Sequence, residues 1–127
     1  MKTATRITAL AGVTALIAAP LTFAAMAPAS ADVDRHGACG AGFYEFSVDK
    51  ERTGYEIDAS IDGVKPGSQW TFVVRHDGNR VTKVTRTADD EGEVDVDAYA
   101  KNAAGKDKFS FVARNGTTKC GTSITVA

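Results

Sequence analysis

From residue 43 onward, the chain consists of short runs in which apolar and polar residues alternate. In the clearest run, 55–61, four apolar residues from Tyr55 to Ile61 alternate with three polar ones. Such alternation is typical of a β-strand that buries one face, and residues that favour turns separate the runs. The pattern predicts seven strands, at 43–48, 55–61, 69–76, 79–87, 93–99, 108–115 and 118–126.

Two strand boundaries carry dipeptides that form two-residue hairpin turns, Asp-Gly at 77–78 and Asn-Gly at 115–116. If residues 115 and 116 form the second turn, Phe111 lies opposite Cys120, and Cys120 points into the core. The strand 79–87 is irregular, since its two valines fall on opposite faces unless a β-bulge intervenes.

The five residues 88–92 form a short loop, and loops of this length commonly join strands that pair with each other. The sequence therefore predicts that the strands before and after this loop are neighbours in one sheet. In that pairing Val84 lies opposite Val96 in the core, and Lys83 lies opposite Asp97 on the surface.

The aromatic residues divide by their phase within each strand. Four of them fall on the apolar side and are expected in the core: Trp70, Phe72, Phe109 and Phe111. The three tyrosines are expected to reach the surface with their hydroxyl groups: Tyr44, Tyr55 and Tyr99. Phe43 is out of phase with its strand, which makes it a candidate for an exposed contact.

The fold class follows from the number and spacing of these strands. Seven short strands within about 100 residues predict an all-β fold, a single two-sheet antiparallel sandwich. Composition agrees, because residues 32–127 contain no Leu or Met, while 23 of these 96 residues are Val, Ile or Thr. This composition excludes a helical bundle, a coiled coil, a transmembrane protein and a disordered tail.

The first 31 residues have the features of a secretory signal peptide. A basic start with Lys2 and Arg6 precedes an apolar stretch, and Ala29-Ser30-Ala31 is a small-x-small cleavage site. We therefore expect a signal peptide at 1–31, a flexible leader at 32–42, a sandwich domain at 43–127, and a secreted, extracellular protein. The remainder carries 13 basic and 16 acidic residues, a net charge of −3, which argues against nucleic-acid and anionic-membrane partners.

The chain has two cysteines, Cys39 and Cys120, near the two ends of the expected mature protein. Outside the cell two such residues form a disulfide, so we expect one bridge that closes the sandwich. A metal site would need more ligands near each cysteine, and a redox pair would have its thiols close together in sequence.

Several segments together carry a resemblance to a family: 70–74, 77–81, 85–87, 102–107 and the terminal Cys120. In these segments the chain resembles small, uncharacterised secreted proteins of actinobacteria, which implies an immunoglobulin-like or fibronectin-type-III-like sandwich between Cys39 and Cys120. The motifs are turn and core features, so the resemblance implies no ligand. True immunoglobulin domains place the tryptophan about a dozen residues after the first cysteine, whereas Trp70 lies 31 residues after Cys39.

The sequence contains no recognisable catalytic motif. Of the two histidines, His36 lies in the leader and His76 lies beside a predicted turn. A general base needs an orienting carboxylate and a nucleophile, and neither is identifiable for His76, so a surface turn position is expected. We expect no catalytic residue, no metal site and no cofactor.

Charged residues gather in two places. An acidic run, 89–97, contains carboxylates that could bind calcium, although its spacing differs from that of the twelve-residue calcium loop. We expect these acids to form a solvated face neutralised by Lys83 and Arg86. Five basic residues could share one sheet face: Arg75, Arg80, Lys83, Arg86 and Arg114. In the pairing predicted above, however, acidic residues lie between them.

The sequence thus predicts a secreted, non-catalytic β-sandwich that binds a cell-surface component, a polysaccharide or a protein, so that its partner is an extracellular protein or a cell-wall component. Two alternatives remain. The protein could inhibit an extracellular enzyme through an exposed loop, or it could be a small calcium-dependent or hydrolytic module that uses the acidic loop 89–97.

Overall fold

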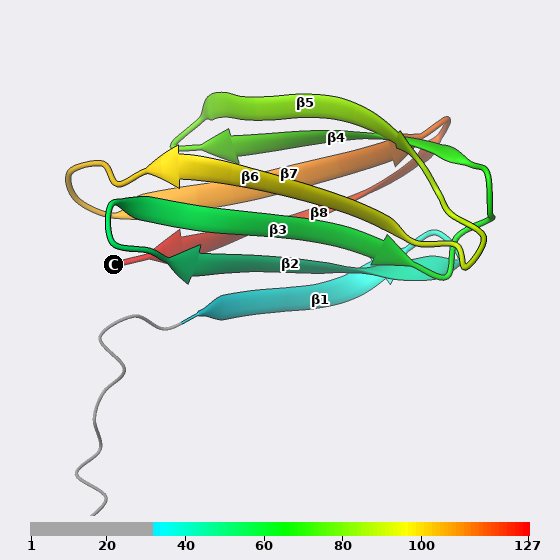
Figure 1. The fold of residues 1–127 in the computed structure, drawn as a ribbon, viewed down its shortest axis with the longest axis horizontal. Coiled ribbons are helices and arrows are strands. Elements are labelled where there is room, and N and C mark those ends of the chain that lie inside the picture. The colour runs from blue at the N-terminus through cyan, green and yellow to red at the C-terminus, as the bar shows by residue number, and fades with distance from the viewer. Residues whose placement is uncertain (1–31) are drawn as a thin grey trace, which may run out of the picture.

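The computed structural model describes residues 32–127, which contain eight strands joined by turns and loops (Figure 1). They are β1 (Val33–Cys39), β2 (Gly42–Lys50), β3 (Gly54–Asp62), β4 (Gln69–His76), β5 (Asn79–Thr87), β6 (Val94–Lys101), β7 (Asp107–Asn115) and β8 (Thr118–Val126). The predicted signal peptide, 1–31, lies outside the described residues. No helix that could cross a membrane occurs within residues 32–127.

The strands form two antiparallel sheets of four strands each. Sheet A has the order β1-β2-β3-β6, and sheet B has the order β5-β4-β7-β8. The chain passes from one sheet to the other between β3 and β4, between β5 and β6, and between β6 and β7. The predicted all-β, two-sheet antiparallel sandwich is confirmed, with eight strands instead of seven.

The additional strand, β1, corrects the prediction of a flexible leader at 32–42. Each residue of β1 pairs with β2, from Val33 opposite Val48 to Cys39 opposite Gly42. Only one side chain of β1, that of Cys39, is fully buried. Two of its inward positions are occupied by Arg35 and Gly37, so the sequence shows no alternation there. Backbone hydrogen bonding holds this segment, and hydrophobic patterning cannot detect that.

The strand pairing around the loop 88–92 also differs from the prediction. The strands β5 and β6 lie in different sheets, so the predicted pairing of Val84 with Val96 is wrong; Val96 instead lies opposite Ala59 of β3. The crossing loop is held by backbone hydrogen bonds to the β3–β4 connection, including Gly67 N–H to the Ala88 carbonyl at 2.9 Å. These non-local bonds direct the chain to the other sheet.

One of the two predicted hairpin turns is confirmed, and the other is displaced. The first turn is Asp77-Gly78, as predicted, because His76 pairs with Asn79. A register shift between β4 and β5 confirms the β-bulge in this hairpin. In the second hairpin, Asn115 pairs with Thr118, so the turn is Gly116-Thr117, one residue later than predicted.

This shift changes the predicted partner of Cys120 in the second hairpin. Cys120 lies opposite Ala113, and Phe111 lies opposite Thr122, so the predicted pairing of Phe111 with Cys120 is wrong. In the observed register, the residue opposite each position is two residues away from the predicted one. Because side chains alternate between the faces with a period of two, each side chain stays on the face predicted for it. Cys120 therefore still points inward, as predicted, and is buried.

The core between the sheets contains the four aromatic residues predicted there, each at most 4% exposed: Trp70, Phe72, Phe109 and Phe111. The prediction for two tyrosines is wrong, since Tyr44 and Tyr55 are buried. Both alternate in phase with the apolar residues of their strands, and that phase outweighs the hydroxyl group. Tyr99 and Phe43 are exposed, as predicted.

The predicted disulfide between Cys39 and Cys120 is present. It joins β1 of sheet A to β8 of sheet B, so it connects the two sheets at the edge where these strands pack side by side.

Candidate functional site

The two outer faces of the sandwich carry opposite charges. On sheet B, strand alternation directs six basic residues to solvent and no acidic one: Arg75, Arg80, Lys83, Lys108, Arg114 and Lys119. We call this surface the basic face. The registers of β4, β5, β7 and β8 place all six on one side, because each lies on the side opposite the buried core residues of its strand.

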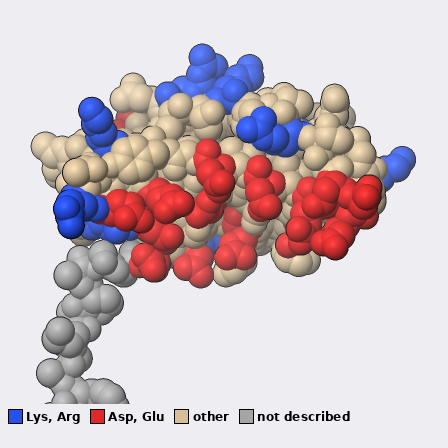
Figure 2. Space-filling model, viewed as in Figure 1, with Lys and Arg blue, Asp and Glu red and all other residues tan. Residues whose placement is uncertain are grey.

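The outer side of sheet A carries eight carboxylates: Asp34, Glu45, Asp49, Glu56, Asp58, Asp62, Asp95 and Asp97. We call it the acidic face. Figure 2 shows the acids as a red band over β2, β3 and β6, with Lys and Arg gathered above them over β5. Apart from His36, its only basic residue in the described chain is Lys101, at the end of β6.

The carboxyl groups of the acidic face repel one another, and this repulsion contributes to a raised pKa. Asp58 and Asp97 lie directly opposite each other in the β3–β6 ladder. Hydrogen bonding to Asp97, partial burial and the neighbouring negative charges raise the pKa of Asp58 to about 7. Because the raised pKa favours the protonated form of the native state, this pair reduces stability as the pH rises from about 4 to about 7.

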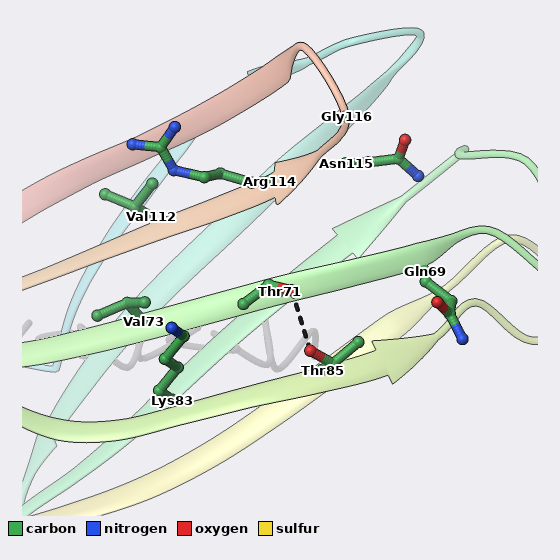
Figure 3. A pocket seen from close by; sticks show the side chains of 9 residues that line it. All are labelled: Gln69, Thr71, Val73, Lys83, Thr85, Val112, Arg114, Asn115 and Gly116. Carbon is green, nitrogen blue, oxygen red and sulfur yellow. Dashed lines mark hydrogen bonds between the residues drawn. The ribbon is translucent and has the colours of Figure 1, made fainter.

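A hollow of about 410 Å³ lies on the basic face (Figure 3). It crosses β5, β4 and β7 and is lined by Gln69, Thr71, Val73, Lys83, Thr85, Val112, Arg114, Asn115 and Gly116. Val73 and Val112 are neighbours in the β4–β7 ladder and give the hollow an apolar floor. The hydroxyl groups of Thr71 and Thr85 are hydrogen-bonded to each other at 2.9 Å.

Two cations flank this floor from different strands. Lys83 lies on β5 and Arg114 on β7, with β4 between them. Two strand spacings separate these strands, roughly 10 Å. A ligand with several anionic groups can therefore contact both cations, while its apolar or hydroxyl-bearing parts lie over the valines and threonines.

Sequence reasoning named four of the six cations but did not place them together without acids. It paired β5 with β6, which would have put Asp97 beside Lys83; in the structure Asp97 belongs to sheet A. The prediction that Lys83 and Arg86 neutralise the acidic run is also wrong: within residues 32–127 the ion pairs involve His36 and His76, and neither Lys83 nor Arg86 forms one with an acid of 89–97. Arg86 lies opposite Trp70 and therefore is not on the basic face.

His76 is not the surface turn residue that the sequence predicted. Its Nε2 lies 2.6 Å from Oδ1 of Asp107 and 3.3 Å from Oδ2 of Asp77, and its side chain is 12% exposed. The ring stacks on Phe109, with 4.5 Å between ring centroids. The sequence did contain a signal, because His76 and Asp107 are each in phase with the buried residues of their strands.

Asp107 is the centre of a hydrogen-bond network that connects the two sheets. The hydroxyl of Tyr55, from sheet A, donates to its Oδ2 at 3.0 Å, and the backbone N–H of Ala103 donates to its Oδ1 at 3.2 Å. Burial raises the pKa of Asp107, but hydrogen bonds from His76, Tyr55 and Ala103 outweigh burial and lower it below 3.8. Burial and the bond to Asp107 raise the pKa of Tyr55 above 10.0.

We expect Asp107→Asn to lower the free energy of unfolding at neutral pH by about 2 to 3 kcal/mol. An amide has one acceptor oxygen, so it cannot accept all three hydrogen bonds. A lowered carboxyl pKa stabilises the native state above pH 3.8, and this contribution is lost as the pH falls through the folded-state pKa. Urea unfolding at several pH values measures both effects.

The difference in free energy of unfolding between the wild type and Asp107→Asn should therefore become smaller as the pH is lowered. Asp90→Asn, in the exposed loop, is the control and should change stability by less than about 0.5 kcal/mol. A stability of Asp107→Asn equal to that of the control would contradict the role of this network.

The acidic loop 89–97 does not bring its carboxylates together around one point. Oδ1 of Asp89 accepts hydrogen bonds from the backbone N–H groups of Glu91 and Glu93, both at 2.9 Å, so it stabilises its own turn. Asp95 and Asp97 lie on the acidic face. Within residues 32–127, two groups of three side chains have a geometry that could hold a metal ion: Asp34, His36 and Glu45, and His76, Asp77 and Asp107.

No protein-family model, no curated protein and no solved structure matches this chain.

Proposed function

We propose that this protein is a secreted, non-catalytic binding domain whose basic face binds an anionic polysaccharide of a cell wall. The observation that carries the proposal is the sorting of charge: six cations and no carboxylate occupy the outer side of sheet B. Since the whole mature chain has a net charge of −3, this face is a local feature that overall charge does not explain.

The shape of the face favours a polymer over a small anion. The hollow is a depression in a sheet, and its cations lie on separate strands across an apolar floor. A single phosphate or carboxylate offers its charge at one point only. A polysaccharide offers repeated anionic groups along its length, and its hydroxyl groups can bond to Thr71, Thr85 and Gln69.

Extracellular location is part of the proposal. A disulfide between two sheets suits an oxidising compartment, and 1–31 has the pattern of a signal peptide. The strand order also supports an immunoglobulin-like classification. In the immunoglobulin lettering, β2, β3 and β6 of the first sheet correspond to strands A, B and E, and β5, β4, β7 and β8 of the second sheet correspond to strands C′, C, F and G. Trp70 then lies on strand C.

We expect Lys83→Gln combined with Arg114→Gln to weaken binding to an anionic polysaccharide by about tenfold at low salt, because two exposed charge pairs are lost. The measurement is co-sedimentation of the oxidised protein with insoluble polygalacturonate and with bacterial cell walls. Neutral cellulose serves as the comparison polymer. High salt should release the wild-type protein, since exposed charges are screened.

Lys50→Gln together with Lys106→Gln is the matched control, because it removes two exposed cations that are not on the basic face. It should bind like the wild type. Equal loss with both double variants would indicate dependence on net charge alone and would overturn the proposal. Failure to pellet with any polymer, together with stoichiometric inhibition of an extracellular enzyme, would support the inhibitor alternative instead.

A further inference from the structure

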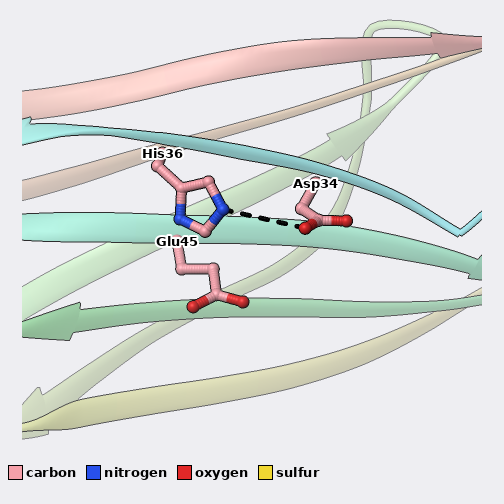
Figure 4. Close-up of side chains that lie close together, drawn as sticks. All are labelled: Asp34, His36 and Glu45. Atoms are coloured by element: carbon pink, nitrogen blue, oxygen red, sulfur yellow. Dashed lines mark ion pairs between the residues drawn. The ribbon is translucent and has the colours of Figure 1, made fainter.

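We propose that Asp34, His36 and Glu45 form a zinc site on the acidic face, beside the β1 edge of sheet A. One ligating atom from each side chain lies within 4.8 Å of the other two. Figure 4 shows the three side chains close together, Asp34 and His36 from β1 and Glu45 from β2. This site lies on the opposite sheet from the proposed polysaccharide face and does not depend on it.

The β1–β2 ladder dictates this arrangement. His36 lies directly opposite Glu45, and Asp34 precedes His36 by two residues, so all three side chains emerge from the same face. Oδ2 of Asp34 lies 3.7 Å from Nε2 of His36. The intervening Arg35 lies opposite Phe46, on the other side of β1, and its guanidinium donates to the Asp34 carbonyl, not to a ligand carboxylate.

The distances are suited to a metal ion after a small movement. Ligands about 2.1 Å from zinc in a tetrahedron lie roughly 3.4 Å apart. The side chains of His36 and Asp34 are 61% and 51% exposed, so they can rotate to close the remaining distance without displacing core residues. Three protein ligands leave the fourth position open for water.

The chemistry of the ligands selects the class of metal. An imidazole nitrogen with two carboxylate oxygens is typical of zinc and related transition metals, whereas Ca²⁺ and Mg²⁺ prefer oxygen ligands. The other carboxylates of the acidic face create a negative potential that attracts a divalent cation to this point. His36 distinguishes this group from the rest of the face, which offers carboxylates alone.

The second cluster, His76, Asp77 and Asp107, is a poorer candidate. Nε2 of His76 is already hydrogen-bonded to Asp107 at 2.6 Å, and Asp107 also accepts bonds from Tyr55 and Ala103. A metal ion would have to break this buried network.

Titration calorimetry with ZnCl₂ at fixed pH tests the proposal on oxidised protein that carries no polyhistidine tag. We expect one zinc ion per chain. His36→Ala and Glu45→Gln should each weaken binding by at least about tenfold, since each removes one of three ligands. Asp95→Asn is the matched control: it removes one charge from the acidic face without removing a proposed ligand, and it should weaken binding less than about threefold.

A second measurement separates this site from the buried histidine. The chain has two histidines, and in the NMR spectrum zinc should shift the ring resonances of His36 and leave those of His76 unchanged. Zinc binding that His36→Ala leaves intact, or that Asp95→Asn weakens as much as Glu45→Gln does, would overturn the proposal. So would displacement of zinc by equimolar CaCl₂, which would indicate carboxylate binding alone.

Discussion

Replacing Cys39 and Cys120 together by alanine is expected to lower the free energy of unfolding by roughly 4 kcal/mol. The bridge spans a sequence separation of 81 residues, and a cross-link over so long a loop strongly restricts the unfolded chain. Small domains have total stabilities of about 5 to 15 kcal/mol, so this is a large fraction. Urea unfolding followed by the fluorescence of Trp70, the single tryptophan, measures the change.

The position of the bridge explains why its loss should also have a local effect. β1 is an edge strand whose single sheet neighbour is β2, and Cys39 ties it to β8 of the other sheet. Without the bridge, the backbone amides of β1 should exchange hydrogen faster than those of β3, which has a strand on each side.

Wild-type protein in excess dithiothreitol is the control and should resemble the double variant. If the double variant unfolds at the same urea concentration as the oxidised wild type, the stabilising role of the bridge is wrong.

Phe111→Ala is expected to lower the free energy of unfolding by about 3 to 5 kcal/mol. The ring of Phe111 is 1% exposed and lies 4.8 Å from Phe46, 5.3 Å from Tyr44 and 6.2 Å from Phe72, between ring centroids. Phe46 and Tyr44 belong to sheet A and Phe72 to sheet B, so Phe111 fills the space between the sheets. Truncation leaves a cavity that neither sheet can close alone.

The matched control is Phe43→Ala, which removes the same atoms from a side chain that is 57% exposed. It should change the free energy of unfolding by less than about 0.5 kcal/mol. Both changes are measured by urea unfolding of the oxidised protein. A similar small effect for Phe111→Ala would show that this ring does not hold the sheets together.

The strands from β2 to β8 could be predicted from the sequence because alternation is a local property. Trp70, Phe72, Phe109 and Phe111 are in phase with their apolar neighbours, and this phase alone indicates which side of each strand is buried. The same rule covers Tyr44, Tyr55 and His76, whose polar groups led the prediction toward the surface. Phase was the better guide at all three positions. The carboxylate of Asp107 satisfies the polar groups of Tyr55 and His76 inside the sandwich.

Which strand lies beside which could not be predicted in the same way. β5 and β6 are joined by a short loop, yet they belong to different sheets, because the loop bonds to the β3–β4 connection. Because β5 and β6 lie in different sheets, Asp97 and Lys83 lie on different outer faces, so acidic and basic residues are separated. The basic face therefore depends on a non-local contact that no run of residues encodes.

The sequence by itself determined the all-β class, most of the strands, the core aromatics and the partners in the disulfide, because alternation and cysteine count need no knowledge of neighbours. The tertiary structure alone decided the edge strand β1, the separation of acidic and basic faces, and the meeting of Asp34 and His36 with Glu45. Each of these depends on backbone pairing between segments, and backbone hydrogen bonds are the same for every residue type except proline.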